Sequence, residues 1–513
     1  MKTRSCSSIL VTTLFALAIT TPVLTQEKDQ TAGAETDHGA AYKKHLHYRL
    51  IDLGTFGGPS SYLATTNMVT GPGAINRVLN NRGTVVGWAD TSALDPFGSS
   101  ILGCFNLPPD CFLPHAFQWQ KGVLTDLGVF HGGDASDAVW ISDTGLIAGQ
   151  ARNGLVDPLI PGWAEIRAVL WKEGKAIDLG TLGGNESSAL SVNNRGQVVG
   201  TAVNTIPDSF SFFATQLRAF LWQDGVMQDL GTLGGPDATA LFVNERGQVA
   251  GMATTNFLPS ADPLCFPPLT THPFLWEKGR MTDLGSLGGD CAIPYALNNQ
   301  GQVVGISDLA GDLAAHPFLW ERGSLIDLGT FGGSVGFAFG INDSGEVVGV
   351  ANSKNDQAQF AFLWKDGVMT NLGTLNGDDC SAAFQINSKG EIVGISFPCA
   401  GGPARLVLWR DGFMTDLSVF APPGSSLTPW GDGAVINDRG EIAGVRVLPD
   451  GDLHAFLLVP CEEDTEGCVD AVEGAASTTN IPARSAGTGT PSIQRRLTPA
   501  AMVAAWRARL APQ

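Results

Sequence analysis

A cation and a carboxylate recur together along the chain, and these are the residues most able to do chemistry. The residue four before a repeated Trp is His115, Arg167, Arg218, His272, His316, Phe360 or Arg405, and His454 precedes Leu458 in an eighth copy. Eleven residues downstream of the first seven stand Asp126, Asp178, Asp229, Asp283, Asp327, Asn371 and Asp416. Such a set could bind an anion, hold a metal ion or exchange protons.

The sixth copy favours a structural role for these residues. Phe360 replaces the cation there, and the carboxylate is replaced by the neutral Asn371. A structural ion pair predicts this joint loss, because a partly buried carboxylate without its cation is costly. We therefore predict structural ion pairs, with His454 joined to Asp52. A ring that binds an anion or a metal is the alternative, although Arg cannot ligate a metal.

Four short strand-like segments per copy must position these side chains. In the third copy they are residues 189–193, 197–202, 219–222 and 226–231. The Asp224-Gly225 pair predicts a two-residue hairpin turn, and Gly196 stands where positive φ is needed. That turn places Phe220 opposite Asp229, so Arg218 lies diagonally across from the carboxylate. The repeated Trp is predicted to be core between repeats, with carbohydrate stacking as the alternative.

The copies are anchored by DLG-like elements, and the later ones are 44 or 45 residues apart. Four strands per repeat are typical of propeller blades, with a solenoid as the alternative. Residues 47–54 and 454–460 each lack a hairpin partner and can supply one another's, whereas a solenoid would need caps. We predict an all-β fold over residues 46–460. It is an eight-bladed β-propeller of four-stranded antiparallel blades, closed by pairing of 47–54 with 454–460.

The motif DLGTLGG, followed by a GQVVG hairpin and then AFLW or HAFLW, resembles the HAF repeat family of extracellular bacterial proteins. The resemblance extends over most of the chain. It implies secretion and a repeat fold, and it brings no established activity or catalytic residues. Copies six to eight depart most, with NLGTLNG and DLSVF in place of the motif.

Composition and charge limit the possible partners. The chain has 513 residues with 64 Gly, 29 Pro and only 16% charged residues, which indicates many tight turns. Its net charge is −19, and nucleic acid binding depends on clustered Lys and Arg. We therefore predict no nucleic acid partner.

The first 25 residues are predicted to be a signal peptide. Lys2 and Arg4 precede an apolar segment from 9 to 19 that is too short to remain as a membrane anchor. Residues 26–45 are expected to be a polar linker. The mature chain is then secreted, periplasmic or at the cell surface, with no transmembrane anchor.

An even number of cysteines follows the signal segment. These eight are Cys104, Cys111, Cys265, Cys291, Cys380, Cys399, Cys461 and Cys468. In an exported chain they favour disulfides over zinc, since CxxC knuckles and nearby His partners are absent. Cys265 with Cys291, and Cys380 with Cys399, are expected to meet, while CFNLPPDC and CEEDTEGC look like local loops.

Nearly all length variation falls in loops of one face, which we call the insert face. Its inserts are residues 90–114, 152–166, 203–217 and 254–271. The aromatic residues in them are Phe97, Phe105, Trp163, Phe210, Phe212, Phe213 and Phe266. Variable loops on a rigid scaffold usually carry binding specificity, so these residues form the candidate binding face.

Residues 461–513 are predicted to be a low-complexity tail. A short helix is expected near its end, with Met502, Trp506 and Leu510 on one face. Docking on the propeller, disorder, and contact with a partner or a membrane surface are the alternatives.

These observations predict a non-catalytic binding or scaffold protein. We expect a monomer without cofactor or metal, and a protein or glycan ligand on the insert face. The alternatives are a glycan-active hydrolase or lyase at the channel mouth and a purely structural envelope protein. HExxH and P-loop motifs are absent. Asp157, Glu165, Asp208 and Asp262 could form a hydrolytic pair, but their spacing does not single them out.

Overall fold

The computed structural model describes residues 45–64, 76–95, 111–159, 164–209, 211, 213–260, 264–265, 269–427, 433–462, 465–472 and 474–475. Within these ranges the chain is all-β, as predicted, apart from two single turns of 3-10 helix. These turns are η1 (Lys354–Asp356) and η2 (Leu417–Phe420). Neither is long and apolar enough to cross a membrane.

The first three repeats each form a separate antiparallel sheet of four strands. The first sheet contains β2 (Gly57–Tyr62), β3 (Val85–Leu94), β4 (Phe112–Gln120) and β5 (Val123–Asp126). The second contains β6 (Ser136–Ile141), β7 (Ile147–Val156), β8 (Ala164–Lys172) and β9 (Lys175–Asp178). The third contains β10 (Ser187–Val192), β11 (Val198–Pro207), β12 (Thr215–Gln223) and β13 (Val226–Asp229).

The next three repeats are joined into one mixed sheet of twelve strands. Its first group is β14 (Ala238–Val243), β15 (Val249–Pro259), β16 (Leu269–Glu277) and β17 (Arg280–Asp283). The second is β18 (Gly288–Leu297), β19 (Val303–Leu309), β20 (Ala315–Glu321) and β21 (Ser324–Asp327). The third is β22 (Gly332–Ile341), β23 (Val347–Ser353), β24 (Gln359–Lys365) and β25 (Val368–Asn371). Each group is antiparallel, and single parallel pairs at Thr271–Cys291 and Ala315–Val335 link them.

Two five-stranded sheets complete the fold. One holds β26 (Cys380–Ile386), β27 (Ile392–Phe397), β28 (Arg405–Arg410), β29 (Phe413–Asp416) and β34 (Gly474–Ala475). The other has the order β30 (Val435–Ile436), β31 (Ile442–Val447), β32 (Leu453–Pro460), β1 (His45–Asp52) and β33 (Val469–Val472). Thus β1 and β32, which the sequence leaves without hairpin partners, pair with each other, and Asp52 lies opposite Phe456.

Part of the tail predicted at residues 461–513 pairs with the sheets. β33 pairs antiparallel with β1, and β34 pairs antiparallel with β29. β33 and β34 therefore extend two neighbouring sheets, because the outer strands β1 and β29 offer open edges to which a further strand can bond. The helix predicted around Met502, Trp506 and Leu510 lies outside the described residues.

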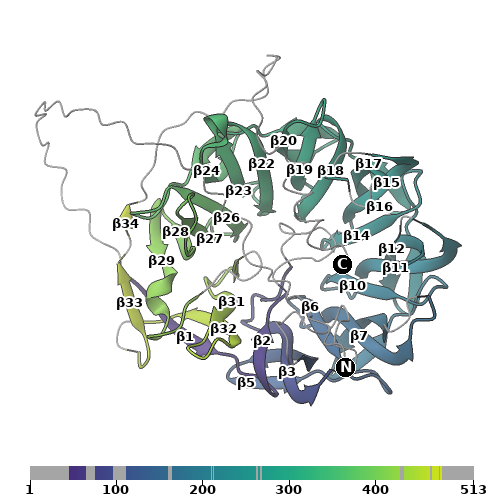
Figure 1. Ribbon diagram of the computed structural model, residues 1–513, viewed down its shortest axis with the longest axis horizontal. Coiled ribbons are helices and arrows are strands. Elements are labelled where there is room, and N and C mark those ends of the chain that lie inside the picture. The colour runs from purple at the N-terminus through teal and green to yellow at the C-terminus, as the bar shows by residue number, and fades with distance from the viewer. Residues whose placement is uncertain are drawn as a thin grey trace, which may run out of the picture.

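The sheets stand around a common centre, which is the arrangement of a β-propeller (Figure 1). The first strand of a repeat lies beside the centre, as β10 and β14 do, and the fourth lies at the rim, as β5 and β17 do. Antiparallel order places the loops after second strands on one face, and this is the insert face.

The hairpins have the predicted geometry. Asp224 and Gly225 have φ values of 50° and 87°, as a type I′ turn requires, and Gly196 has a φ of 78°. Phe220 is opposite Asp229. The last Gly of the GQVVG motif, Gly200, is required for a different reason. A Cβ at this position would lie 2.0 Å from the carbonyl oxygen of Ser188. The first strand approaches too closely for any side chain at this position.

The repeated Trp and Phe pack between neighbouring repeats. Trp222 and Phe220 of the third repeat share a core cluster with Ala168 and Leu170 of the second. Phe220 is fully buried and Trp222 is 9% exposed. The repeated Trp is therefore core here, as predicted.

An Asn follows the first strand in every repeat except the second, which has Ser142, and this Asn has two roles. Asn193 Oδ1 accepts the backbone N–H groups of Arg195 and Gln197, which is the predicted turn chemistry. Its Nδ2 donates to the carbonyl of Asn244 in the next repeat at 3.0 Å. The bond recurs from Asn80 to Ser142, Asn244 to Asn298, Asn298 to Asn342, Asn342 to Asn387, Asn387 to Asn437 and Asn437 to Asn80. We call this set the asparagine ladder.

Candidate functional site: the junction of the second and third repeats

The cations and carboxylates of the repeat lie together in most copies. The distance from His Nδ1 to Asp is 2.8 Å for His115–Asp126, 3.0 Å for His272–Asp283, 2.9 Å for His316–Asp327 and 2.9 Å for His454–Asp52. Arg218 Nε lies 3.0 Å from Asp229. Arg405 lies 3.4 Å from Asp416, and closer, at 2.7 Å, to Asp378.

The pair predicted between Arg167 and Asp178 is the exception. Arg167 Nη2 instead lies 3.4 Å from Glu165 Oε2. Glu165 stands two residues earlier on the same strand and its side chain is 7% exposed, so it competes for the guanidinium. The next repeat has Gln216 at this position, and there the Arg–Asp pair forms.

Each Asp of these pairs, and Asn371 in the sixth repeat, also bonds the turn that follows it. Asp126 Oδ1 accepts the N–H of Gly128 at 2.7 Å, and Asn371 Oδ1 accepts that of Gly373 at 2.8 Å. Burial raises the pKa of Asp126, but the bonds from His115 and Gly128 outweigh burial and hold it below 3.8. The hydrogen bond to Asp126 raises the pKa of His115 above 6.5. The pair therefore fixes a bend of the chain.

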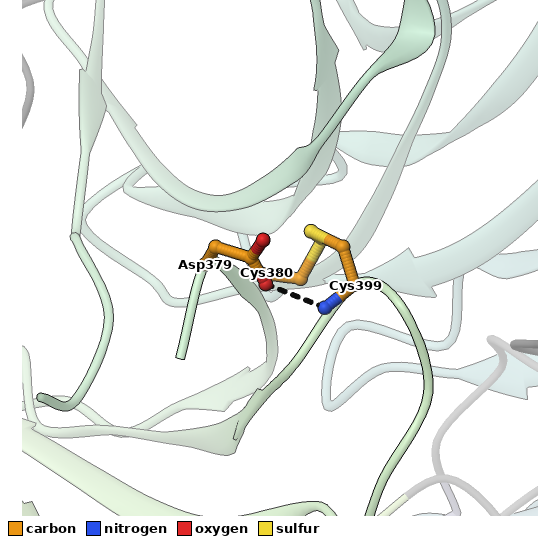
Figure 2. Close-up of side chains that lie close together, drawn as sticks. All are labelled: Asp379, Cys380 and Cys399. Atoms are coloured by element: carbon orange, nitrogen blue, oxygen red, sulfur yellow. Dashed lines mark hydrogen bonds between the residues drawn. A yellow bond between two sulfur atoms is a disulfide. The ribbon is translucent and has the colours of Figure 1, made fainter. Parts of the chain in front are cut away.

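One cluster has the residue types of a metal site, and it is shown in Figure 2. Asp379, Cys380 and Cys399 lie within reach of one ion. The two sulfur atoms are bonded to each other, so neither is a thiolate that could ligate a metal. Asp379 Oδ1 accepts the backbone N–H of Cys399 at 2.6 Å, which fastens the disulfide loop.

Three of the predicted disulfides are present. They join Cys265 to Cys291, Cys380 to Cys399 and Cys461 to Cys468, with Cα–Cα distances of 5.4, 5.2 and 6.2 Å. Cys111 is also disulfide-bonded, and Cys104 lies outside the described residues.

Of the predicted binding-face aromatics, Phe213 is within the described part of the chain. The other six, which are Phe97, Phe105, Trp163, Phe210, Phe212 and Phe266, lie outside it. Phe213 borders a cavity of about 40 Å³ between the second and third repeats, room for a water-sized group. Ile166 and Leu217 supply its apolar wall, and Gln150, Thr201 and Glu186 supply its polar groups.

Glu186 is the most perturbed acid of this junction. It is 6% exposed, and its Oε2 accepts the N–H of Ile166 at 2.6 Å. Its carboxyl is also hydrogen-bonded to the carboxyl of Asp157, the insert residue that directly follows β7. Burial, followed by the repulsion of Asp157 and Glu165, raises the pKa of Glu186 to about 9. At neutral pH the Glu186–Asp157 pair therefore holds one proton.

A second acid lies behind the cavity wall. Gln150 Nε2 donates to Asp137 Oδ2 at 3.2 Å, and Asp137 is 6% exposed. Burial raises the pKa of Asp137 to about 7. Glu186 and Asp137 thus give this junction two carboxyls that are protonated, wholly or in part, at neutral pH.

The next junction repeats the arrangement. Asp208 is the insert residue that directly follows β11, and its carboxyl is hydrogen-bonded to that of Asp237 in the fourth repeat. Asp237 Oδ1 accepts the N–H of Leu217 at 2.7 Å. Burial, with the repulsion of Asp208, raises the pKa of Asp237 to about 7.

Sequence reasoning named Asp157, Glu165 and Asp208 but missed Glu186 and Asp237. Both missed acids directly precede a first strand, in NESSALSVN and PDATALFVN. The available signal was an acid at this position in two successive copies. Their partners, Asp157 and Asp208, each lie 29 residues earlier in the sequence, and only the fold brings the two members of each pair together. Asp262 lies outside the described residues.

Comparison with known proteins gives no family. No family model and no curated protein matches the chain. Solved structures similar to it include the β-propeller domain of the Trilobed protease from Pyrococcus furiosus, with 11% identity, a TM-score of 0.39, and coverage of 68% of this chain and 97% of that one. TolB from Acinetobacter baumannii has 11% identity and a TM-score of 0.31, with 64% and 82% covered. A gluconolactonase from Xanthomonas campestris has 12% identity and a TM-score of 0.26, with coverage of 48% of this chain and 79% of that one. At these TM-scores the similarities say nothing about what this chain does.

Proposed function

We propose that the chain is an extracytoplasmic eight-bladed β-propeller that binds a protein or glycan ligand through its insert face without catalysing a reaction. The observation that carries this proposal is a strip of exposed aliphatic side chains. It occupies corresponding positions in three successive repeats.

The strip lies at the ends of β3, β7 and β11. Leu94, Leu155, Val156 and Ile206 are exposed by 60, 58, 53 and 53%. Phe213 and the cavity at Glu186 lie beside the last of these strands. The opposite face carries single exposed valines at the starts of fourth strands, such as Val226. Apolar groups gathered on one face are typical of a binding surface.

Eight blades and ring closure are supported by strand pairing and by the asparagine ladder. The pairings gather β2 to β29 into seven groups of four, and β30, β31, β32 and β1 make an eighth. The ladder bond from Asn437 to Asn80 joins the eighth group to the first. These contacts are what a closed ring requires.

An extracytoplasmic location is supported by the disulfides, which persist in oxidising compartments. The signal peptide predicted at residues 1–25 lies outside the described residues. Membership of the HAF repeat family and a monomeric state remain predictions from the sequence.

The carboxyl pairs do not favour a glycan hydrolase. Glycoside hydrolases hold their two carboxyls roughly 5 to 9.5 Å apart, to leave room for the sugar or a water. The Glu186 and Asp157 carboxyls are in direct hydrogen-bond contact, as are those of Asp237 and Asp208. Neither pair has room for a scissile bond.

The test is a glycan array probed with the protein of residues 26–513. Leu155→Asp combined with Ile206→Asp places two charges in the strip and should abolish binding. The matched control, Val226→Asp, changes an exposed valine of the opposite face and should leave binding unchanged. Equal binding by both variants would contradict the use of the insert face, and turnover of a bound glycan would contradict a non-catalytic role.

A further inference from the structure

We propose that Asp157 with Glu186, and Asp208 with Asp237, are proton-sharing clamps. Each clamp holds the insert residue that directly follows the second strand of a repeat against the next repeat, and loss of the shared proton releases this residue. The structure places the clamps at equivalent positions of two successive junctions.

The equivalence follows from the hydrogen bonds around each pair. Asp157 and Asp208 directly follow β7 and β11, and they are 2% and 9% exposed. Their partners directly precede β10 and β14, and each partner accepts an N–H from the strand beside the insert. These bonds run from Ile166 to Glu186 and from Leu217 to Asp237. The two sites are thus built in the same way.

The junction of the first and second repeats shows a clamp that needs no shared proton. Asp95 follows β3 at the corresponding position, and the fully buried Arg152 contacts it at 2.7 and 3.0 Å. Arg152 Nη1 also lies 3.3 Å from Asp134. Val203 and Thr254 occupy the Arg152 position in the next two repeats. Where the guanidinium is lost, a second carboxyl takes its place beside the insert, and two buried carboxyls can touch only if they share a proton.

The charged groups around each pair increase its dependence on pH. Glu186 faces the carboxylates of Asp157 and Glu165, while the Arg167 guanidinium is engaged by Glu165. Asp237 faces Asp208 and also the guanidinium of Arg218, which favours its ionised form. The pKa is about 9 for Glu186 and about 7 for Asp237, so the second clamp should open first as pH rises.

The sign of the effect on stability follows from linkage. Because the folded-state pKa of Glu186 is raised above 4.5, its contribution is fully present below pH 4.5 and is lost as pH rises through about 9. For Asp237 the corresponding window runs from 3.8 to about 7. Within each window the unfolding equilibrium constant rises by up to about tenfold per pH unit for one shared proton.

If the proposed binding function holds, the clamps would also regulate it. Phe213 and Leu217 border the cavity beside Glu186, so release of either insert would change the shape of the insert face. This consequence rests on the proposed function. The clamps themselves do not, and they are tested without any ligand.

The test uses the full chain and two readouts. Infrared difference spectra should show the C=O stretch of protonated carboxyls at pH 7, reduced in Glu186→Gln and lost from the wild type above pH 9. Urea denaturation at pH values from 5 to 10 should show a loss of stability with rising pH that is smaller in Glu186→Gln and in Asp157→Asn. The matched control is Glu165→Gln, which removes a neighbouring carboxylate that is bonded to Asn153 and Arg167. It should keep a loss of stability with rising pH, shifted to lower pH because the repulsion of Glu165 helps to raise the pKa of Glu186.

Release of the inserts is measured by chymotrypsin cleavage at Leu159 and Phe213. Cleavage at Phe213 should increase above pH 7, and cleavage at Leu159 only above about pH 9, relative to Glu186→Gln and Asp237→Asn at the same pH. The proposal is overturned if the wild-type infrared spectrum lacks the protonated band. It is also overturned if calcium ions stabilise the wild type but not Glu186→Gln, since the pair would then hold a cation in place of the proton.

Discussion

Asn437 donates a hydrogen bond from Nδ2 to the backbone carbonyl of Asn80 at 2.9 Å, although 357 residues separate them. The same bond joins Asn193 to Asn244 and Asn387 to Asn437 between successive repeats. Contact between the last and first repeats is therefore made by the chemistry that joins neighbours elsewhere. The second repeat has Ser142 at the Asn position. The backbone carbonyl of Ser142 accepts the hydrogen bond from Asn80, but the Ser side chain has no amide to donate to the next repeat.

We expect Asn437→Ala to destabilise the protein by about 1–3 kcal/mol, because it removes both the donor to Asn80 and the oxygen that accepts from Arg439 and Glu441. Asn437→Asp should cost more, because it buries a carboxylate against Glu441 Oε2, which accepts a hydrogen bond from Asn437 at 2.6 Å. Urea denaturation monitored by Trp fluorescence measures both. Equal stability of Asn437→Ala and wild type would show that the ladder bond contributes nothing at this junction.

The sixth repeat offers a test of the ion-pair interpretation. Asn371 is 8% exposed, so Asn371→Asp should bury a carboxylate without a cation and destabilise the fold. Adding Phe360→His should recover part of that loss, with a coupling of about 0.5–3 kcal/mol in a double-mutant cycle near pH 6. A coupling of zero would mean that the two positions vary independently.

The His115–Asp126 pair predicts a second pH dependence of stability. The bond to Asp126 raises the pKa of His115, so its stabilisation is fully present below pH 6.5 and is lost as pH rises through the folded value. Asp126→Asn should return the pKa of His115 towards 6.5, measured by titration of its imidazole NMR signals. Asp178→Asn, in a repeat where the Arg has turned to Glu165, should leave the His115 titration unchanged.

The disulfides should contribute different amounts to the free energy of unfolding. The Cys265–Cys291 bridge spans 26 residues and the Cys461–Cys468 bridge spans 7. Closing the longer loop removes more entropy from the unfolded chain, so replacing Cys265 and Cys291 by Ala should cost about 3 kcal/mol. The same change at Cys461 and Cys468 should cost less. Thermal denaturation of the two double variants under oxidising conditions ranks them.

Much of the fold was predictable because the same strand and turn signals recur in every copy of the repeat. The Asp224-Gly225 turn and the Phe220–Asp229 register each depend on residues close in sequence, and the period of the repeat brings them together in every copy. The pairing of β1 with β32 was also predictable, because each strand lacked a hairpin partner.

The candidate site was less accessible, because its contacts join different copies at positions where the copies differ. Glu186 looks like an ordinary polar residue before a strand until the fold places Asp157 beside it. The prediction of Asp178 as the partner of Arg167 was wrong for the same reason. A pattern shared by the repeats predicted Asp178, and the local substitution Glu165 decided the contact.

The strands β33 and β34 have a mechanical consequence. Tension applied to the chain beyond Ala475 meets β34 on β29 first and β33 on β1 next, and the disulfide loop at Cys461 and Cys468 lies between these strands and β32. Two rim strands and a covalent loop would therefore absorb a pull before it reached the pairing of β1 with β32. A tether at this end would load the rim of the molecule and spare the insert face.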